Sequence, residues 1–165
     1  MNAIVLTDRL WAIGRDGGLL FSLPKDMERL STLTQGGTVI LSHQFLKSFP
    51  NGMPLPQRRN IIITRDVDHA PDGYETAPDP ETALSIAGGP NADNLWIIGG
   101  GNVYAALLAR CRRAYLTRVD ARVEDADTFF PNLDKLPGWK AEKTGEPMNE
   151  NGLTYRFVDY VNTKL

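Results

Sequence analysis

Short apolar runs alternate with amphipathic stretches along most of the chain. The runs are bounded by polar or turn-forming residues and are rich in β-branched residues, as buried strands are. They cover residues 3–7 (AIVLT), 38–42 (TVILS), 60–64 (NIIIT), 95–98 (LWII) and 114–119 (AYLTRV). The stretches between them predict helices over residues 24–34, 43–49, 80–87 and 102–110. This alternation predicts an α/β fold with a mainly parallel sheet.

The pattern changes after residue 119. The chain runs through DADTFFP (125–131) and a stretch with glycine and proline to LTYRFVDYV (153–161), in which apolar and polar residues alternate. Such alternation predicts antiparallel strands, here at one edge of the sheet. With 165 residues, 42% of them hydrophobic, we expect residues 1–165 to form a single domain.

Charge and composition exclude several classes of function. A formal net charge of -2 gives no electrostatic reason to expect nucleic acid or an anionic membrane as the main partner. The single cysteine, Cys111, excludes an internal disulfide, and we expect a cytoplasmic setting. Residues 1–10 lack the basic region of a signal peptide, and no apolar segment is long enough to cross a bilayer. The two histidines and the cysteine lie far apart, so we expect no metal site.

One acid occupies an unusual place in the predicted helix over residues 24–34, for which Ser22 is a possible cap. At helical spacing, one stripe contains Leu23, Asp26, Met27, Leu30 and Leu33, whereas Lys25, Glu28 and Arg29 point elsewhere. Asp26 is either a first-turn acid favoured by the helix dipole or a functional carboxylate whose pKa burial raises. A cleft lined by Met27, Leu30 and Leu55 would suit a flat heteroaromatic ligand held by one polar anchor.

A run of three glycines joins the strand at residues 95–98 to the following helix. Glycine lets the backbone approach a ligand, and the first N–H groups of a helix bind phosphate. The run is not G-x-G-x-x-G, so the dinucleotide-binding fingerprint is absent. It is either a pyrophosphate site or a tight turn.

Two further segments each allow two interpretations. Residues 11–20 contain three glycines and form either a plain connection or a lid that closes over a ligand. Arg58 and Arg59 precede a buried strand and are either solvated or placed so that one of them grips a carboxylate.

Six segments, in order, make the chain resemble the dihydrofolate reductase family, in particular its bacterial members. They are residues 13–14 (IG), 23–27 (LPKDM), 54–61 (PLPQRRNI), 98–104 (IGGGNVY), 115–120 (YLTRVD) and 127–131 (DTFFP). The resemblance implies a central, mostly parallel sheet of eight strands with an antiparallel C-terminal edge, flanked by about four helices. It implies hydride transfer from NADPH to dihydrofolate, giving tetrahydrofolate for one-carbon metabolism. It also implies a monomer that binds antifolates such as trimethoprim and methotrexate.

The resemblance also assigns residues to the substrate. Asp26 would promote protonation of the pterin imine, with Thr117 orienting it. Phe21 stands where the family nearly always has tryptophan, whose N–H holds a water at the substrate, so we expect a slower or more pH-sensitive protonation. Arg58, rather than Arg59, would grip the glutamate tail. The substrate set is Ile4, Val5, Asp26, Met27, Leu30, Phe49, Leu55, Arg58, Ile98 and Thr117.

For the cofactor, the resemblance implies a cis peptide between Gly99 and Gly100 and a pyrophosphate held by the helix start that follows. Asp127 would hold the mobile loop in its closed state. The cofactor set is Leu6, Ile13, Gly14, Leu19, His43, Gln44, Phe45, Thr64, Arg65, Ile98, Gly99, Gly100, Gly101, Asn102, Val103 and Tyr104.

The chain departs from the family pattern after the strand at residues 38–41. Where members have Gly-Arg-x-Thr, it has Ser42, His43, Gln44 and Phe45, so the arginine that reads the 2′-phosphate is missing. Arg65 could supply that charge. Leu20, Phe21 and Leu30 also alter the antifolate pocket, and we expect weaker binding of diaminopyrimidines.

Three alternatives stay open. A reductase of riboflavin synthesis shares the fold but lacks the LP-x-D-M element and the Arg58 clamp. A non-catalytic folate- or nucleotide-binding homologue would explain Phe21 and the altered 42–45 segment. A plain α/β interaction module would leave Asp26 on the apolar stripe unexplained.

Overall fold

A central sheet organises the molecule, which is described by a computed structural model covering residues 1–49 and 52–165. Its strands are β1 (Asn2–Thr7), β4 (Thr38–Ser42), β5 (Arg59–Ile63), β6 (Tyr74–Ala77), β7 (Leu95–Gly99), β8 (Arg113–Val119), β10 (Trp139–Thr144) and β12 (Leu153–Asn162). They lie in the order β10-β12-β8-β1-β7-β4-β5-β6, and β11 (Met148–Glu150) pairs with β12. The strands from β8 to β6 are parallel to one another. At the other edge, β12 pairs antiparallel with β8, and β10 pairs antiparallel with β12. The predicted fold class and the antiparallel edge are confirmed.

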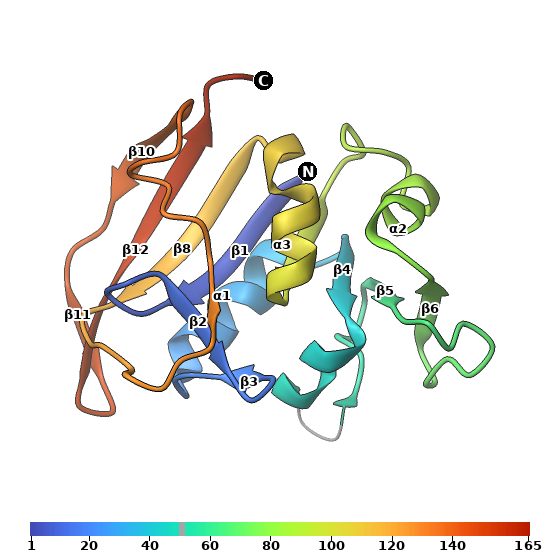
Figure 1. Cartoon of the computed structure of the whole chain (residues 1–165), viewed down its shortest axis with the longest axis horizontal. Coiled ribbons are helices and arrows are strands. Elements are labelled where there is room, and N and C mark those ends of the chain that lie inside the picture. The colour runs from blue at the N-terminus through green and yellow to red at the C-terminus, as the bar shows by residue number, and fades with distance from the viewer. Residues whose placement is uncertain (50–51) are drawn as a thin grey trace.

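Helices cover both faces of this sheet (Figure 1). The helices are α1 (Pro24–Thr34), α2 (Pro80–Ile86) and α3 (Gly101–Leu107), with 3₁₀ helices η1 (His43–Ser48) and η3 (Leu108–Arg110). Successive residues of a strand point to opposite faces. On β1, Ile4 therefore packs in one cluster with Leu30 of α1, and Val5 packs in another with Leu107 of α3. The two faces thus have separate apolar cores, with α1 and η1 on one side and α2 and α3 on the other.

The start of α1 differs in detail from the prediction. Ser22 is not the cap, because Leu23 occupies the N-cap position with an extended backbone and no side-chain cap. Instead, a carboxylate oxygen of Glu150 accepts the Lys25 N–H at 3.1 Å. The first turn of α1 is therefore tied to β11, 125 residues further along the chain.

Residues 11–20, interpreted as a connection or lid, form part of a second sheet. It contains β3 (Gly18–Leu19), β2 (Ala12–Arg15) and β9 (Thr128–Phe129), in that order and all antiparallel. In Figure 1 this hairpin lies at the end of the molecule where η1 and the N-terminus of α3 also lie. It is therefore a paired element placed beside the carboxyl ends of the central strands.

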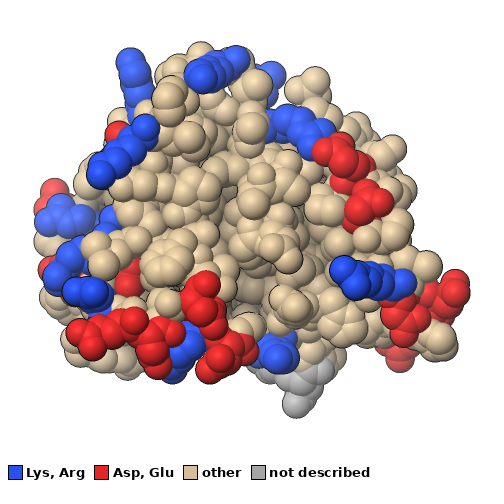
Figure 2. Space-filling model, in the orientation of Figure 1, with Lys and Arg blue, Asp and Glu red and all other residues tan. Residues whose placement is uncertain are grey.

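Charged side chains are spread around the edge of the face drawn in Figure 2, and its middle consists of uncharged residues. Within residues 1–49 and 52–165, no helix combines the length and the apolar character needed to span a membrane. The same residues contain no cluster of three or more histidine, cysteine, aspartate or glutamate side chains suited to a metal ion.

Candidate functional site

A cavity lies between α1, η1, the start of α3 and the β2–β3 hairpin. Its walls come from segments far apart in sequence, and most of them are apolar or glycine. The lining residues are Ile4, Val5, Leu6, Ile13, Gly14, Gly17, Gly18, Leu19, Asp26, Met27, Leu30, Ser42, Gln44, Phe45, Ser48, Phe49, Ile98, Gly100, Gly101, Asn102, Tyr104 and Thr128. Parallel strands β1, β4 and β7 end at this cavity, as is usual for ligand sites of open α/β sheets.

Asp26 is the acidic side chain of this cavity. Thr117, buried on β8, donates its hydroxyl to Asp26 Oδ1 at 2.6 Å. Burial raises the pKa of Asp26, while the Thr117 hydrogen bond and the positive charge of Arg29 act in the opposite direction. The cavity therefore contains a fixed carboxyl group that holds a proton at higher pH than an exposed aspartate does.

Phe21 lies beside this cavity rather than in its wall. It packs in a cluster with Leu6, Leu23 and Tyr155. It also lines a second, neighbouring cavity that includes Asp26, together with Lys47 and other residues of 19–27 and η1. Asp26 is thus bordered by two cavities, and a phenyl ring forms part of the second.

Two of the three glycines, Gly99 and Gly101, are packed closely against neighbouring elements. The Gly99–Gly100 peptide is cis, as expected. A Cβ on Gly99 would lie 2.7 Å from the ring of Phe45, and one on Gly101 would lie 2.7 Å from Cγ2 of Thr128. The Gly100 N–H donates to Ser42 Oγ at 3.2 Å. Backbone close approach at this turn therefore requires glycine at both positions.

The start of α3 presents only part of the predicted cofactor set to the cavity. Gly100, Gly101 and Asn102 line it, whereas Val103 is turned into the core. Tyr104 lines the cavity with its ring, and its hydroxyl donates to the Ile4 carbonyl at 2.6 Å. Burial raises the pKa of this phenol well above its usual value. Tyr104 is therefore a neutral hydrogen-bond donor that ties α3 to β1.

The segment that departs from the family pattern is divided between the cavity and the surface. Gln44 and Phe45 line the cavity, and Phe45 meets Phe49 edge-to-face with ring centres 5.7 Å apart. His43 is exposed, with Nδ1 3.3 Å from the Thr64 hydroxyl, and Arg65 follows, also exposed. His43, Thr64 and Arg65 lie together at the ends of β4 and β5, outside the cavity wall.

The two neighbouring arginines point in different directions. Arg59 pairs with Glu75, with Nη2 2.8 Å from Oε1. Arg58 lies against the C-terminal half of α1 and donates to Thr34 Oγ1 at 2.8 Å and to Ser31 Oγ at 3.0 Å. It also donates to the carbonyls of Pro56 and Ser31. Arg58 therefore lies on the α1 side of the sheet, outside the cavity wall.

Leu55 also lies outside the main cavity. It packs in the apolar cluster that contains Leu30 and Phe49, on the same face of the sheet as α1. Of the predicted substrate set, Leu55, Arg58 and Thr117 thus lie outside the cavity wall. The other members line the cavity.

Asp127 joins the β2–β3 hairpin to the segment before β9. Its Oδ2 accepts the Asp16 N–H at 2.9 Å, and its Oδ1 accepts the Thr128 hydroxyl at 2.8 Å. These donors lower the pKa of the Asp127 carboxyl. The expected contact between Asp127 and residues 11–20 is therefore present in this structure.

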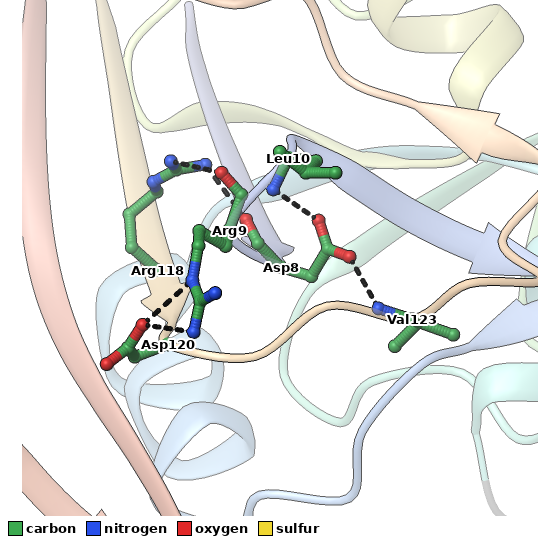
Figure 3. A network of polar contacts seen from close by, with 6 residues as sticks. All are labelled: Asp8, Arg9, Leu10, Arg118, Asp120 and Val123. Carbon is green, nitrogen blue, oxygen red and sulfur yellow. Dashed lines mark hydrogen bonds and ion pairs between the residues drawn. The ribbon is translucent and has the colours of Figure 1, made fainter.

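A second polar network fixes the root of the hairpin (Figure 3). Asp8 is buried, and its Oδ1 accepts the N–H groups of Leu10 and Ala12 at 2.8 and 2.9 Å. Its Oδ2 accepts the Val123 N–H at 2.9 Å, so one carboxylate holds two loops. Arg118, directly after Thr117, donates to the Asp8 carbonyl at 3.0 Å. The network therefore fixes the β2–β3 hairpin relative to β8.

Five lining residues were not predicted: Gly17, Gly18, Ser42, Ser48 and Thr128. Ser48 Oγ is buried and has no hydrogen-bond partner among the described residues. An unpaired buried hydroxyl that faces a cavity is suited to bind a ligand. Ser42 and Thr128 could have been inferred from their neighbours, since they adjoin the 43–45 segment and Asp127. Nothing in the sequence indicates Ser48.

Comparison with known proteins identifies the family. The family model described as dihydrofolate reductase matches residues 1–162. The chain belongs to the dihydrofolate reductase family. It is 34% identical over 149 residues to the dihydrofolate reductase of Neisseria meningitidis serogroup A, covering 90% of both chains. It is 35% identical over 152 residues to that of Mycobacterium tuberculosis, covering 90% of this chain and 89% of the relative.

A type 3 dihydrofolate reductase of Salmonella typhimurium is 33% identical over 147 residues, covering 88% of each chain. The family assignment agrees with the fold, because the sheet is mostly parallel with antiparallel strands at the C-terminal edge. The chain is therefore an enzyme of the dihydrofolate reductase kind, and its site can be interpreted in those terms.

Proposed function

We propose that this protein reduces dihydrofolate to tetrahydrofolate with NADPH as the hydride donor. The observation that carries the proposal is the Asp26–Thr117 pair, a proton-holding carboxyl in the wall of an otherwise largely apolar cavity. The names of the relatives describe those proteins as reductases of dihydrofolate. An imine accepts hydride far better when its nitrogen is protonated, so a proton source beside an apolar hydride path suits this chemistry.

The substrate pterin would occupy the α1 side of the cavity. Asp26 would hydrogen-bond its amino group and ring nitrogen, and the side chains of Met27, Leu30 and Phe49 would pack against its rings and the aminobenzoyl group. These three side chains form an apolar slot, and Asp26 is its polar anchor. A site for a flat heterocycle usually has this composition. Ile4, Val5 and Ile98 would form the floor of the slot.

Two features of the cavity fit NADPH. The Gly100–Asn102 segment opens α3 into the cavity without side chains at the first two positions, which leaves room for a pyrophosphate. Ser48 Oγ of η1, which also lines the cavity, is buried without a partner among the described residues and is suited to bond a polar group of a ligand. Leu6, Ile13, Gly14 and Leu19 would surround the nicotinamide and its ribose. When bound, NADPH supplies the hydride.

The protein's own contribution to the reaction is then positioning, exclusion of water and control of one proton. Asp26 promotes protonation of the imine nitrogen, directly or through a water, and Thr117 fixes the orientation of its carboxyl. Phe21 cannot donate a hydrogen bond to a water in the neighbouring cavity. We therefore expect the proton to be delivered more slowly, or with a stronger dependence on pH, than in relatives that have tryptophan there.

The far ends of both ligands would meet positive charge. His43 and Arg65, beside Thr64, would face the 2′-phosphate of NADPH, with Arg65 carrying the permanent charge. Arg58 would grip the glutamate carboxylate of the substrate. Its present partners are uncharged oxygens of Ser31, Thr34 and Pro56, which a carboxylate could replace with a stronger, charge-assisted pair.

Oxidation of NADPH by purified protein, followed by absorbance with and without dihydrofolate, tests this function. We expect dihydrofolate-dependent oxidation that falls roughly 10²- to 10⁴-fold in Asp26→Asn, the usual contribution of a positioned acid. Thr117→Val should retain part of the activity, because the acid remains. A wild-type protein that binds both ligands by calorimetry and oxidises no NADPH would instead be a non-catalytic homologue.

A further inference from the structure

Arg29 is a charged residue that no part of the proposed reaction uses. It lies on α1 three residues after Asp26, and its sequence pattern placed it away from the apolar stripe. In the structure its side chain is only 16% exposed, because it folds back between α1 and strands β8 and β12. It does not line either cavity that borders Asp26.

The Arg29 guanidinium is held on several sides. Nη2 pairs with Asp159 Oδ1 of β12 at 2.7 Å, and Nη1 donates to the Leu116 carbonyl of β8 at 3.2 Å. The guanidinium carbon lies 4.1 Å from the ring centre of Phe157 and 5.8 Å from that of Tyr115. Ion pairs between exposed side chains contribute little to stability. The Arg29–Asp159 pair contributes more, because it is partly buried and the guanidinium also stacks on an aromatic ring.

These contacts reach the same place on β8 as the acid does. Arg29 bonds to Leu116, and Asp26 accepts from Thr117, the next residue of the strand. The first turns of α1 are therefore attached to adjacent residues of one strand by two side chains one helical turn apart. Two such points fix both the rotation of α1 and its height above β8.

We infer that Arg29 is a positioning residue for Asp26, fastening α1 to β8 and β12 so that the carboxyl meets Thr117 with a fixed positive charge nearby. The inference rests on the proposed function for its role in the reaction. The geometry itself is independent of any ligand.

The groups that influence the charge of Asp26 come from several elements. Arg29 on α1 lowers its pKa against the larger effect of burial. On the opposite sides, the phenols of Tyr104 on α3 and Tyr155 on β12 have pKa values raised by burial and, to a smaller extent, by Asp26 itself. Glu150 of β11 lies near Tyr155 and binds the Lys25 N–H. The Thr117 hydroxyl of β8 and Arg29 both favour the ionised form of Asp26, and of these two groups only Arg29 carries a charge.

The first experiment follows the Asp26 carboxyl carbon by NMR during a pH titration of the ligand-free protein, with Asp26→Asn used to assign the signal. Arg29→Met removes the charge and the bonds, and Arg29→Lys keeps the charge. Lys25→Met is the matched control, because it removes one positive charge from the same helix at a side chain that is 61% exposed. We expect the midpoint to move to higher pH in Arg29→Met, to move less in Arg29→Lys and to stay unchanged in Lys25→Met.

The second experiment measures dihydrofolate reduction against pH for the same variants. Arg29→Met should shift the midpoint of the profile in the same direction and lower kcat about ten- to hundred-fold, as a small misplacement of a reacting group does. A folded Arg29→Met with the midpoint and profile of the control would overturn the inference. Should Arg29→Met fail to fold, Asp159→Asn takes its place, since it frees the guanidinium while keeping the charge. A folded Asp159→Asn with wild-type kcat would then overturn it.

The two readouts separate this inference from the proposed function. A shifted carboxyl titration in a protein that reduces no dihydrofolate would contradict the function and leave the positioning role intact. Normal reduction with no shift in either readout would contradict the positioning role and leave the function intact.

Discussion

Asp26 affects stability and catalysis in opposite directions. Burial raises the pKa of its carboxyl in the folded protein, so the folded state binds this proton more tightly than the unfolded chain. The stabilising effect of the proton is complete below the unfolded pKa, near 3.8, and is lost as pH rises through the folded pKa. At neutral pH the group therefore decreases the free energy of unfolding.

We predict that Asp26→Asn has a higher Tm than the wild type at pH 7, although it loses most of its activity. The difference in Tm should shrink towards acidic pH, where the wild-type carboxyl is protonated in both states. Glu28→Gln, on the exposed side of α1, serves as the control. Differential scanning calorimetry from pH 4 to pH 8 checks this, and a lower Tm for Asp26→Asn at pH 7 would contradict it.

The positions of His43 and Arg65 lead to a prediction about the preference for NADPH over NADH. His43 is exposed beside Thr64, and neutral histidine is a weak partner for a phosphate. His43→Arg adds a bidentate, permanently charged donor, so we expect the KM for NADPH to fall about 5- to 10-fold, or roughly 1 kcal/mol. The KM for NADH, which lacks the phosphate, should stay unchanged. Arg65→Ala should raise the KM for NADPH alone, and an equal change for both cofactors would contradict the assignment.

Some residues of the site could be predicted from the sequence, and others could not. Asp26 could be singled out because an acid on an apolar stripe is costly without a function, and Thr117 because its segment resembles the family. Helical spacing predicts Arg29 on the polar side of α1, because it contains no information about Asp159, 130 residues away. Ser48 was missed for the same reason, since an unpaired hydroxyl is defined only by its tertiary surroundings.

At the scale of elements, α3 and β9 meet so closely that one methyl group decides the contact. A Cβ on Gly101 would lie 2.7 Å from Thr128 Cγ2, a distance that real Cβ atoms do not reach. We predict that Gly101→Ala raises the KM for NADPH at least 10-fold and lowers Tm, because overpacking costs about 1–3 kcal/mol. Thr128→Ser removes Cγ2 and keeps the hydroxyl.

The double variant Gly101→Ala/Thr128→Ser is the decisive one. It should regain most of the Tm lost in Gly101→Ala, and part of the cofactor affinity, whereas Thr128→Ser alone should change little. Thermal melts and cofactor titrations of the four proteins form a double-mutant cycle. An additive result would mean that Gly101 is required for a reason other than its contact with β9.

The contact between Asp127 and the β2–β3 hairpin depends on pH. Its hydrogen bonds to Asp16 and Thr128 lower the pKa of Asp127, so the contact is complete above the unfolded pKa and is lost as pH falls through the folded value. We predict that Asp127→Ala slows hydride transfer about 3- to 10-fold, by loosening the hairpin over the cavity. Stopped-flow mixing with NADPH measures this step.

Glu124→Ala is the matched control for that prediction. It removes an exposed acid from the same segment, and this side chain makes no hydrogen bond or ion pair with the other described residues. Asp125 is unsuitable, because it pairs with Arg15 of β2 and so also contacts the hairpin. An equal slowing in both variants would indicate a general effect of charge rather than the contact between Asp127 and the hairpin.

Long apolar elements were predictable from the sequence, and short paired ones were not. The five apolar runs match β1, β4, β5, β7 and β8, and the bounds predicted for α1 agree with those observed. Strands β2, β3 and β9 have two to four residues, too few for a pattern of alternation. Their pairing depends on Asp8 and Asp127, each of which bonds to a segment more than 100 residues away along the chain.

At the scale of the whole molecule, Cys111 reports on the integrity of the main core. It is fully buried in the cluster beneath α2 and α3, and burial raises its pKa to about 12. A thiol reagent needs an exposed thiolate. We predict that labelling of Cys111 at pH 8 is more than about 10³-fold slower in the native protein than in urea, because it requires unfolding. Rapid labelling under native conditions would contradict this.

The order of the sheet has a consequence for biosynthesis. Strand β1 is the first to leave the ribosome, yet it lies between β7 and β8, so both its edges stay unpaired until residues 95–119 have been made. The hydrogen bond between Thr117 and Asp26 likewise forms only after Thr117 has been made, 91 residues later. At the usual speed of translation this interval lasts about 5–20 s. During that time the nascent chain exposes a largely apolar strand, and chaperones that bind extended apolar segments would find a binding site there.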